Sequence, residues 1–202
     1  MNELPINRST LKENLHNANT WIRGAWMLLF IIVYEIAAFV IGLLAIVQFV
    51  LLLTAGTPHS TLLSFSQRLN AYVYQIINYL IYATEERPFP FSSFPKMELP
   101  SSVMYANATL DFSNAQQFIR NYRFWLRGCF MLVFALIHFF VLEYIMYGII
   151  FFQFGSVLFV ATANEALKQL AKSLCAYIYQ IISYLTFNSD EKPFPFSRLP
   201  AL

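Results

Sequence analysis

The chain contains two copies of one sequence unit, and this internal repeat restricts the fold more than any other feature. The segment WIRGAWMLLF at residues 21–30 recurs as WLRGCFMLVF at 125–134, and AYVYQIINYL at 71–80 recurs as AYIYQIISYL at 176–185. Each copy has a Trp-x-Arg-Gly entry, a long apolar run, a second segment with scattered polar residues and a Pro-Phe-Pro-Phe exit. Such self-similarity indicates a tandem duplication of one structural unit.

The sequence between the copies, SSFPKMELPSSVMYANATLDF, is rich in Ser and Pro and reads as a surface linker. We therefore place the first unit, with its N-terminal arm, at residues 1–98, the linker at 99–112 and the second unit at 113–202. The N-terminal arm lacks the basic start, short apolar core and cleavage site of a secretory signal. We expect the first apolar segment to be an uncleaved anchor.

The composition is that of a membrane protein. Hydrophobic residues make up 58% of the chain and charged residues only 12%, whereas soluble domains have roughly a quarter charged residues. The net charge of +2, without a stripe of Lys and Arg, argues against nucleic-acid binding.

The sequence has no arrangement typical of an enzyme or a metal site. Cys129 and Cys175 lack metal-binding spacing, and His16, His59 and His138 are far apart. There is no Gly-x-Ser-x-Gly elbow and no glycine-rich phosphate loop. We expect a non-enzymatic protein with no cofactor, no metal and no catalytic residues.

Two helices are expected in each unit. Residues 24–54 contain a single formal charge, Glu35, and would form a helix of about 46 Å against a hydrocarbon core of roughly 30 Å. We expect one tilted helix, with a re-entrant hairpin broken near Gly42 as the alternative. Residues 62–83 have apolar positions at helical spacing and one polar face, which either packs into a bundle or lies along the interface. The predicted fold class is an all-α membrane helical bundle, a tandem duplication of a two-helix unit.

The distribution of basic residues predicts the topology. Lys and Arg collect in the N-terminal arm, around the linker and in the tail, and the short loops near Thr57 and Thr162 have none. The positive-inside rule then gives four crossings with both termini cytoplasmic, which requires parallel first helices. The basic residues Arg68, Lys168 and Lys172 count against this topology. Two spans with two interfacial helices are the alternative.

Three features together resemble a known family: an apolar helix ending in Gln-Phe, the pattern Tyr-x-x-Gln-Ile, and a close such as TFNSDEKPFPFS. They are similar to the bacterial domain-of-unknown-function family number 4389, and the resemblance covers nearly the whole chain twice. It implies a bacterial inner-membrane location and brings no established activity. Copy one keeps the loop TAGTPHSTLL, where copy two has VATANEALKQ, so we expect the second turn to be built differently.

The exit motif follows each second segment as EERPFPFS and DEKPFPFS. Its prolines must stop the helix, by about Glu86 in copy one, and favour a polyproline-like strand with projecting Phe rings. The motif is then either a helix terminator with an aromatic anchor or a docking site for a partner. The residues concerned are Pro88, Phe89, Pro90, Phe91, Pro193, Phe194, Pro195 and Phe196.

A polar seam is expected on the second helix of each unit. Tyr and Gln residues spaced by three and four share one helix face, and their hydrogen bonds would join the two copies or line a site for a lipid headgroup. The seam residues are Tyr72, Gln75, Tyr79, Tyr177, Gln180 and Tyr184.

Glu35 and His138 are the ionisable residues deepest in the apolar runs, about 16 and 15 Å along their helices from Gly24 and Gly128. With parallel first helices they would reach the same height. We expect Glu35 to form a buried hydrogen bond between the copies, with His138 or with a Tyr of the second helix. The alternative is a separate niche for each residue.

These observations predict an integral inner-membrane protein that acts as a scaffold or accessory subunit of a membrane complex. The alternative is a lipid-interacting or transport-related protein with a polar cleft between its helices, and a proton-responsive element is a third, weaker hypothesis. The expected partners are membrane lipid and either a membrane protein or a second copy of the chain.

Overall fold

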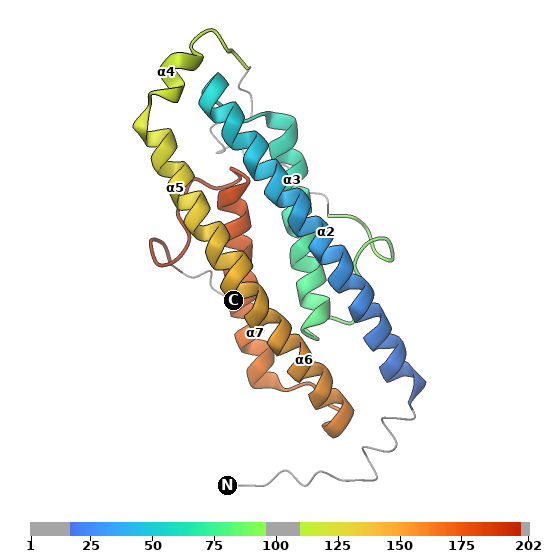
Figure 1. Cartoon of the computed structure of the whole chain (residues 1–202). Helices are drawn as coiled ribbons and strands as arrows, with labels where there is room; N and C mark the ends of the chain where they lie inside the picture. Colours follow the sequence, from blue (N-terminus) through green and yellow to red (C-terminus); the bar gives the residue numbers. More distant parts are fainter. Residues whose placement is uncertain (1–16, 96–109, 199–202) are drawn as a thin grey trace.

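The computed structural model describes residues 17–95 and 110–198 (Figure 1). The described part of the chain is helical, with turns and no strands, and the predicted all-α bundle of tandem two-helix units is confirmed. The N-terminal arm and most of the linker lie outside the described residues. The elements are α2 (Ala18–Ala55), α3 (Ser60–Leu80), α4 (Ala115–Ile119), α5 (Tyr122–Ile137), the π-helical turn η1 (His138–Leu142), α6 (Glu143–Val160) and α7 (Glu165–Leu185).

Helix α2 is one uninterrupted helix of 38 residues. The Asn17 side chain caps its start by accepting a hydrogen bond from the Asn19 amide, and Gly56 ends it in the left-handed conformation at φ 75°. The helix continues through Gly42, so the hairpin broken at that residue is wrong. At 1.5 Å per residue α2 is about 57 Å long.

Repeat two builds the same helix from α5, η1 and α6. Asn121 caps its start by the same hydrogen bond, and Ala161 ends it at φ 64°. The stretch Tyr122–Val160 has 39 residues, one more than α2. The π-helical turn accommodates the additional residue, because a π turn contains one more residue than an α turn and keeps the flanking helices in register.

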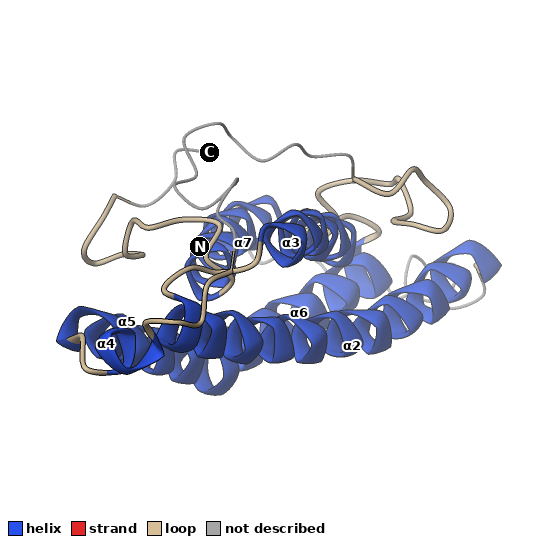
Figure 2. Ribbon diagram, turned by 90° about the horizontal axis from the view of Figure 1, so that it is seen from above, coloured by secondary structure: helices blue, strands red, loops and turns tan. Residues whose placement is uncertain are grey.

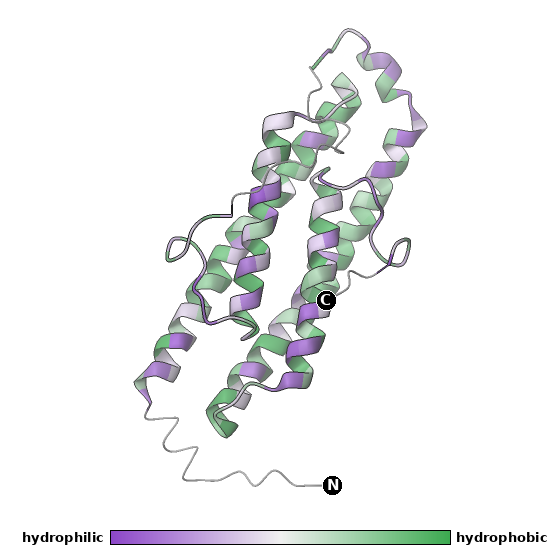
Figure 3. Cartoon of the chain, turned by 180° about the vertical axis from the view of Figure 1, so that it is seen from behind, coloured by the Kyte–Doolittle hydropathy of each residue, from purple (hydrophilic) through white to green (hydrophobic). Residues whose placement is uncertain are grey.

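The helices form two layers (Figure 2). Helices α2, α5 and α6, with η1, make the long-helix layer, and α3 with α7 makes the short-helix layer. The core lies between the layers, where Phe30 and Phe134 meet Ile76 and Ile181, all of them buried. Hydrophilic residues concentrate on the short helices and at the helix ends, and the long helices are mostly hydrophobic (Figure 3).

The first helices of the two repeats run antiparallel, so the parallel arrangement expected from the basic residues is wrong. The start of α2 meets the end of α6, with the Trp21 and Phe154 rings 6.4 Å apart, and the end of α2 meets the start of α5, with Phe49 and Trp125 6.2 Å apart. The four-crossing topology required parallel first helices and does not fit this arrangement.

Close packing at two glycines favours the antiparallel register. A Cβ at Gly24 would lie 3.0 Å from the Phe154 ring, and one at Gly128 would lie 2.5 Å from the Phe49 ring. Each Phe therefore packs on a glycine near the start of the opposing helix. A parallel arrangement would separate both pairs by most of the length of a helix.

Candidate functional site

Each Trp-x-Arg-Gly entry holds the exit loop of its own repeat. We define the exit loops as residues 81–95 and 186–198. The Arg23 guanidinium forms an ion pair with Glu85, donates to the Thr84 carbonyl and lies 4.0 Å from the centre of the Tyr82 ring. Burial raises the pKa of the Tyr82 phenol, and the Arg23 charge acts in the opposite direction. This guanidinium and its contacts form the arginine latch of repeat one.

Repeat two has the same latch at matching positions. Arg127 pairs with Asp190 at 2.6 Å, donates to the Ser189 carbonyl at 3.0 Å and to that of Tyr184 at 3.5 Å, and lies over the Phe187 ring. Both arginine side chains are largely buried, at 17% and 14% exposed, whereas their acidic partners are mostly exposed. The hydrogen bonds to carbonyls and the contacts with rings therefore stabilise the latch more than the charge pairing does.

The basic residue of each exit motif lies over an aromatic ring of the first helix. Arg87 lies 4.8 Å from the centre of the Trp26 ring, which also contacts Phe91 edge-on at 4.6 Å. In repeat two, Lys192 lies 3.9 Å from the centre of the Phe130 ring. In the motif EERPFPFS, Glu85, Arg87 and Phe91 therefore all contact the first helix of their own repeat.

The expected polyproline-like strand is wrong, because each exit motif closes into a tight turn. The Phe91 amide donates to the Pro88 carbonyl at 3.1 Å, and the Phe196 amide donates to that of Pro193 at 3.0 Å. The Phe89–Pro90 and Phe194–Pro195 peptides are cis. The Phe89 and Phe91 rings are 44% and 52% exposed, and those of Phe194 and Phe196 are 44% and 61% exposed.

The polar seam acts within each repeat and does not join the two. The Tyr72 hydroxyl donates to the Phe89 carbonyl at 2.8 Å, and the Tyr177 hydroxyl donates to that of Phe194 at 2.9 Å. Gln180 donates to the Arg198 carbonyl at 2.9 Å. Tyr79 and Tyr184 pack on Phe30 and Phe134 and lie under the latch arginines. The Gln75 Oε1 atom is buried and has no hydrogen-bond partner within the part of the chain that the structure describes.

Other residues, which sequence reasoning missed, join α3 of repeat one to the exit loop of repeat two. Asn70 donates to the Thr186 hydroxyl at 2.9 Å, and Asn188 donates to the Ser66 hydroxyl at 2.8 Å. All four residues are polar where the other repeat has an apolar residue or Cys: Asn70 matches Cys175, Thr186 matches Ile81, and Asn188 and Ser66 each match an Ala. A polar residue in only one copy was therefore the signal for contacts between copies.

A buried glutamine fixes the turn between the helices of each repeat. The Gln48 side chain accepts from the His59 amide at 2.8 Å and donates to the His59 carbonyl at 3.3 Å, and Gln153 makes the same two bonds to Asn164. Both glutamines are fully buried. The second turn is thus built like the first, against expectation, with Ala161 in the left-handed position of Gly56.

Glu35 has a partner in the other repeat, but it is not His138, and the Glu35 side chain is exposed and not buried as expected. The Glu35 carboxylate accepts a hydrogen bond from the Tyr147 hydroxyl, which also lies 3.3 Å from Glu143 Oε1. Tyr147 comes from α6, in the long helix, and not from the second helix as expected. The His138 Nδ1 atom has no hydrogen-bond partner among the described residues. We name Glu35, Glu143 and Tyr147 the carboxyl cluster.

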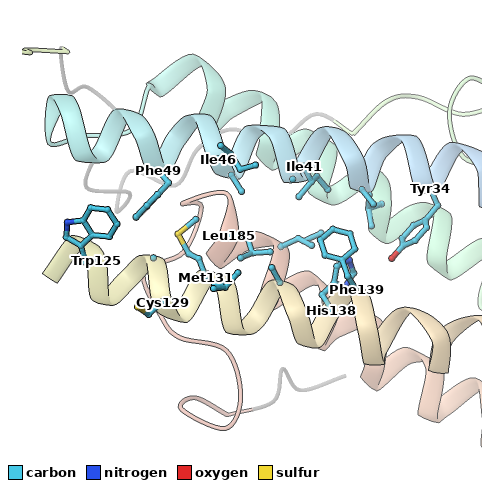
Figure 4. Close-up of a pocket in the computed structure, with 18 residues that line it drawn as sticks. Tyr34, Ile41, Ile46, Phe49, Trp125, Cys129, Met131, His138, Phe139 and Leu185 are labelled. Atoms are coloured by element: carbon cyan, nitrogen blue, oxygen red, sulfur yellow. The ribbon is translucent and has the colours of Figure 1, made fainter. Parts of the chain in front are cut away.

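Two apolar cavities lie between the long helices, on either side of this region. The first, of about 510 Å³, lies between the C-terminal half of α2 and α5 (Figure 4), and the second, of about 570 Å³, lies between the N-terminal half of α2 and α6. Trp125 and Gly128 line the first cavity, and their repeat equivalents Trp21 and Gly24 line the second. The repeat symmetry therefore relates the two cavities.

The cavities differ in the polar groups at their inner ends. His138 and the Tyr34 hydroxyl point into the first cavity (Figure 4), and Glu35 and Tyr147 line the second. The remaining lining of these two cavities is almost entirely apolar, so neither of them is the expected polar cleft. A smaller and more polar cavity, of about 340 Å³, lies beside the exit loop of repeat two and is lined by Gln67, Gln180 and Asn188 among others. Among the described residues, no three His, Cys, Asp or Glu side chains are grouped as metal ligands.

These features define a helical bundle of two antiparallel, two-helix repeats with two helices long and apolar enough to cross a membrane. Residues 17–92 and 121–197 each match the family described as Domain of unknown function (DUF4389). The chain belongs to this family, in two tandem copies, as the resemblance indicated. Neither a curated protein nor a solved structure matches the chain.

Proposed function

We propose that this protein is a non-enzymatic, lipid-interacting protein of the bacterial inner membrane that holds lipid hydrocarbon chains between its long helices. The observation that carries the proposal is the pair of symmetry-related apolar cavities of about 510 and 570 Å³. Both volumes fall within the range of roughly 300–1,000 Å³ in which proteins bind small apolar ligands. The family resemblance supports the inner membrane as the location.

The packing of the long helices explains why the cavities stay open. Gly42 and Ala38 face the first cavity from α2, and Ala135 faces it from α5, so small residues stand where larger ones would fill the space. A dry apolar cavity in a membrane protein is stabilised when hydrocarbon fills it, because its lining gains the dispersion contacts that a void lacks. Lipid chains are the hydrocarbon available there.

Filling one cavity tests the proposal. Gly42→Phe places a ring in the first cavity, and a Cβ at Gly42 meets no atom within 4 Å. Gly148→Phe is the matched control, because a Cβ at Gly148 is equally free and this residue lines neither cavity. We expect Gly42→Phe to reduce the lipid that copurifies in mild detergent, measured by native mass spectrometry. Equal lipid retention by the two variants would refute the proposal.

A scaffold or accessory role is the second candidate, favoured by the exposed rings of the exit loops. Phe89 and Phe194 are each 44% exposed, and their rings pack edge-on against Tyr72 and Tyr177 of their own repeat. If these rings hold a membrane protein or a second copy of the chain, Phe89→Ala with Phe194→Ala should release that partner from the purified complex. Unchanged partners in this double variant would reject docking at the exit loops.

A further inference from the structure

We propose that the molecule lies flat in one leaflet of the membrane, with the outer face of the long-helix layer in the hydrocarbon and the short-helix layer towards the headgroups and water. The inference goes beyond lipid binding in the cavities and does not depend on it. Three observations carry it: the apolar outer face, the polar opposite layer and the position of the exit loops.

The outer face of the long-helix layer is apolar over most of its length, and its exposed carboxylate, Glu35, accepts a hydrogen bond from Tyr147. Exposed apolar residues on α2 recur every three or four positions, opposite the buried positions that face the short helices. The most exposed include Ile36, Phe39, Ile46, Leu132, Phe140 and Phe151, each between 60% and 74% exposed. An apolar surface that extends over two helices of such length is one that hydrocarbon covers in a membrane protein.

The short-helix layer has the opposite character. Arg68 on α3 and Gln169 on α7 are exposed, Lys172 is partly exposed, and Lys168 pairs with Glu165 at 2.8 Å. The three basic residues that counted against four crossings, at positions 68, 168 and 172, therefore all belong to this layer. Basic residues at that level would lie beside the headgroups, where anionic lipids attract them.

The exit loops exclude an upright orientation. Tyr72, in the middle of α3, binds the Phe89 carbonyl and packs on Phe94, and Tyr177, in the middle of α7, binds the Phe194 carbonyl. Both loops thus lie near the middle of the molecule's long axis (Figure 1). With the long helices along the bilayer normal, this irregular backbone and exposed charges such as Glu86 and Asp190 would lie in the hydrocarbon. Lipid-exposed irregular backbone does not occur there.

The dimensions fit a flat orientation. One leaflet contributes about 15 Å of hydrocarbon, and a helix with its side chains is roughly 10–12 Å across. A single layer of helices therefore fits within one leaflet, and the second layer then lies at the level of the headgroups. The exit loops lie on the side of the short-helix layer (Figure 2).

Cysteine labelling at three exposed positions distinguishes the orientations. Thr61→Cys and Thr162→Cys lie at opposite ends of the molecule and Ser93→Cys lies in an exit loop, each in a Cys129→Ser, Cys175→Ala background. We expect all three to react with a membrane-impermeant maleimide from the same side of sealed vesicles. Upright antiparallel repeats would label the two ends from opposite sides, and upright parallel repeats would label Ser93→Cys from the side opposite to both ends. Either result would overturn the proposal.

A depth measurement tests what covers the apolar face. A bimane label at Phe39→Cys or Phe140→Cys should be quenched several-fold more strongly by brominated phospholipid chains than the same label at Arg68→Cys or Lys172→Cys. All four sites are on the surface, so the labels leave the core intact. Weak quenching at Phe39→Cys and Phe140→Cys would show that a second copy or another protein covers the face, and the proposal would then be wrong.

Discussion

The two repeats share the contacts that build each unit and differ at the contacts that join them. The arginine latch, the glutamine at the turn and the bond from tyrosine to the exit carbonyl occur in both, through Arg23 and Arg127, Gln48 and Gln153, and Tyr72 and Tyr177. These contacts recur although many other positions have changed. They are therefore the requirements of the two-helix unit itself.

The differences gather along the interface between the repeats. The π-helical turn, Glu143 and Tyr147 occur only in repeat two, and Glu35 occurs only in repeat one. The hydrogen bond from Tyr147 to Glu35 joins one repeat to the other. The carboxyl cluster is thus a product of the fused pair, and a single unit would not contain it.

The largest expected effect comes from deleting one residue from either long helix. Deleting Val40 rotates the C-terminal half of α2 by about 100° and removes Gln48 from its turn, so we expect this variant not to fold. Deleting Val141 converts η1 into a regular helix with both flanks in register, so it should fold and keep the bond from Tyr147 to Glu35. Size-exclusion profiles and thermal unfolding in detergent measure both. Equal tolerance of the two deletions would show that η1 does not absorb the additional residue.

The buried glutamines should give the next largest effect. Gln48→Leu or Gln153→Leu leaves the amide at the next helix start unpaired and removes one of the two donors to the carbonyl of the same residue, which should cost about 3 kcal/mol of unfolding free energy. Gln169→Leu on the exposed face of α7 is the control and should cost almost nothing. Losses below about 1 kcal/mol at both buried sites would mean that water replaces these bonds.

Replacing a latch arginine should give the third largest loss of stability, and the losses at the two latches should differ. Arg127→Met removes donors to two carbonyls and an acid, whereas Arg23→Met removes those to one carbonyl and an acid. We expect losses of about 2 kcal/mol, larger for Arg127→Met, with Arg123→Met on the exposed face as the control. Because the carbonyls and rings contribute more to each latch than the exposed ion pair does, added salt should change these losses little. A larger loss for Arg23→Met would contradict the ranking.

The smallest effect concerns the turn after each long helix. Ala161→Gly should stabilise repeat two by about 0.5–1 kcal/mol, because glycine adopts the φ of 64° without steric cost. Gly56→Ala should destabilise repeat one by more than this, since the added Cβ would lie 2.6 Å from the Phe118 ring. Thermal unfolding of the two variants measures whether each is more or less stable than the original protein. A destabilising effect of Ala161→Gly would show that the turn is not strained.

The sequence predicted what is local to each unit. The matching segments predicted the two-helix repeat. Proline positions predicted only that the second helix stops by about Glu86, and α3 ends earlier, at Leu80. The roles of the exit motif were not predictable in this way. Arg23 and Thr84 are 61 positions apart in the sequence, and Arg23 meets Thr84 and Glu85 only through tertiary packing.

The relative direction of the repeats was not predictable from periodicity either. It depends on Phe49 and Phe154 packing on glycines of the opposite repeat, a pairing that no local pattern records. The mistaken direction also explains the mistaken partner of Glu35. Counting depth along parallel helices matched Glu35 with His138, whereas the antiparallel register brings Tyr147 to it.

Cross-linking tests the antiparallel arrangement most directly. In a Cys129→Ser, Cys175→Ala background, Trp21→Cys with Phe154→Cys should react with a short bis-maleimide within one chain, because the two rings are 6.4 Å apart. Trp21→Cys with Trp125→Cys joins equivalent positions of the repeats and should not react. Efficient cross-linking of positions 21 and 125, with none between 21 and 154, would show that the repeats are parallel and would contradict the account.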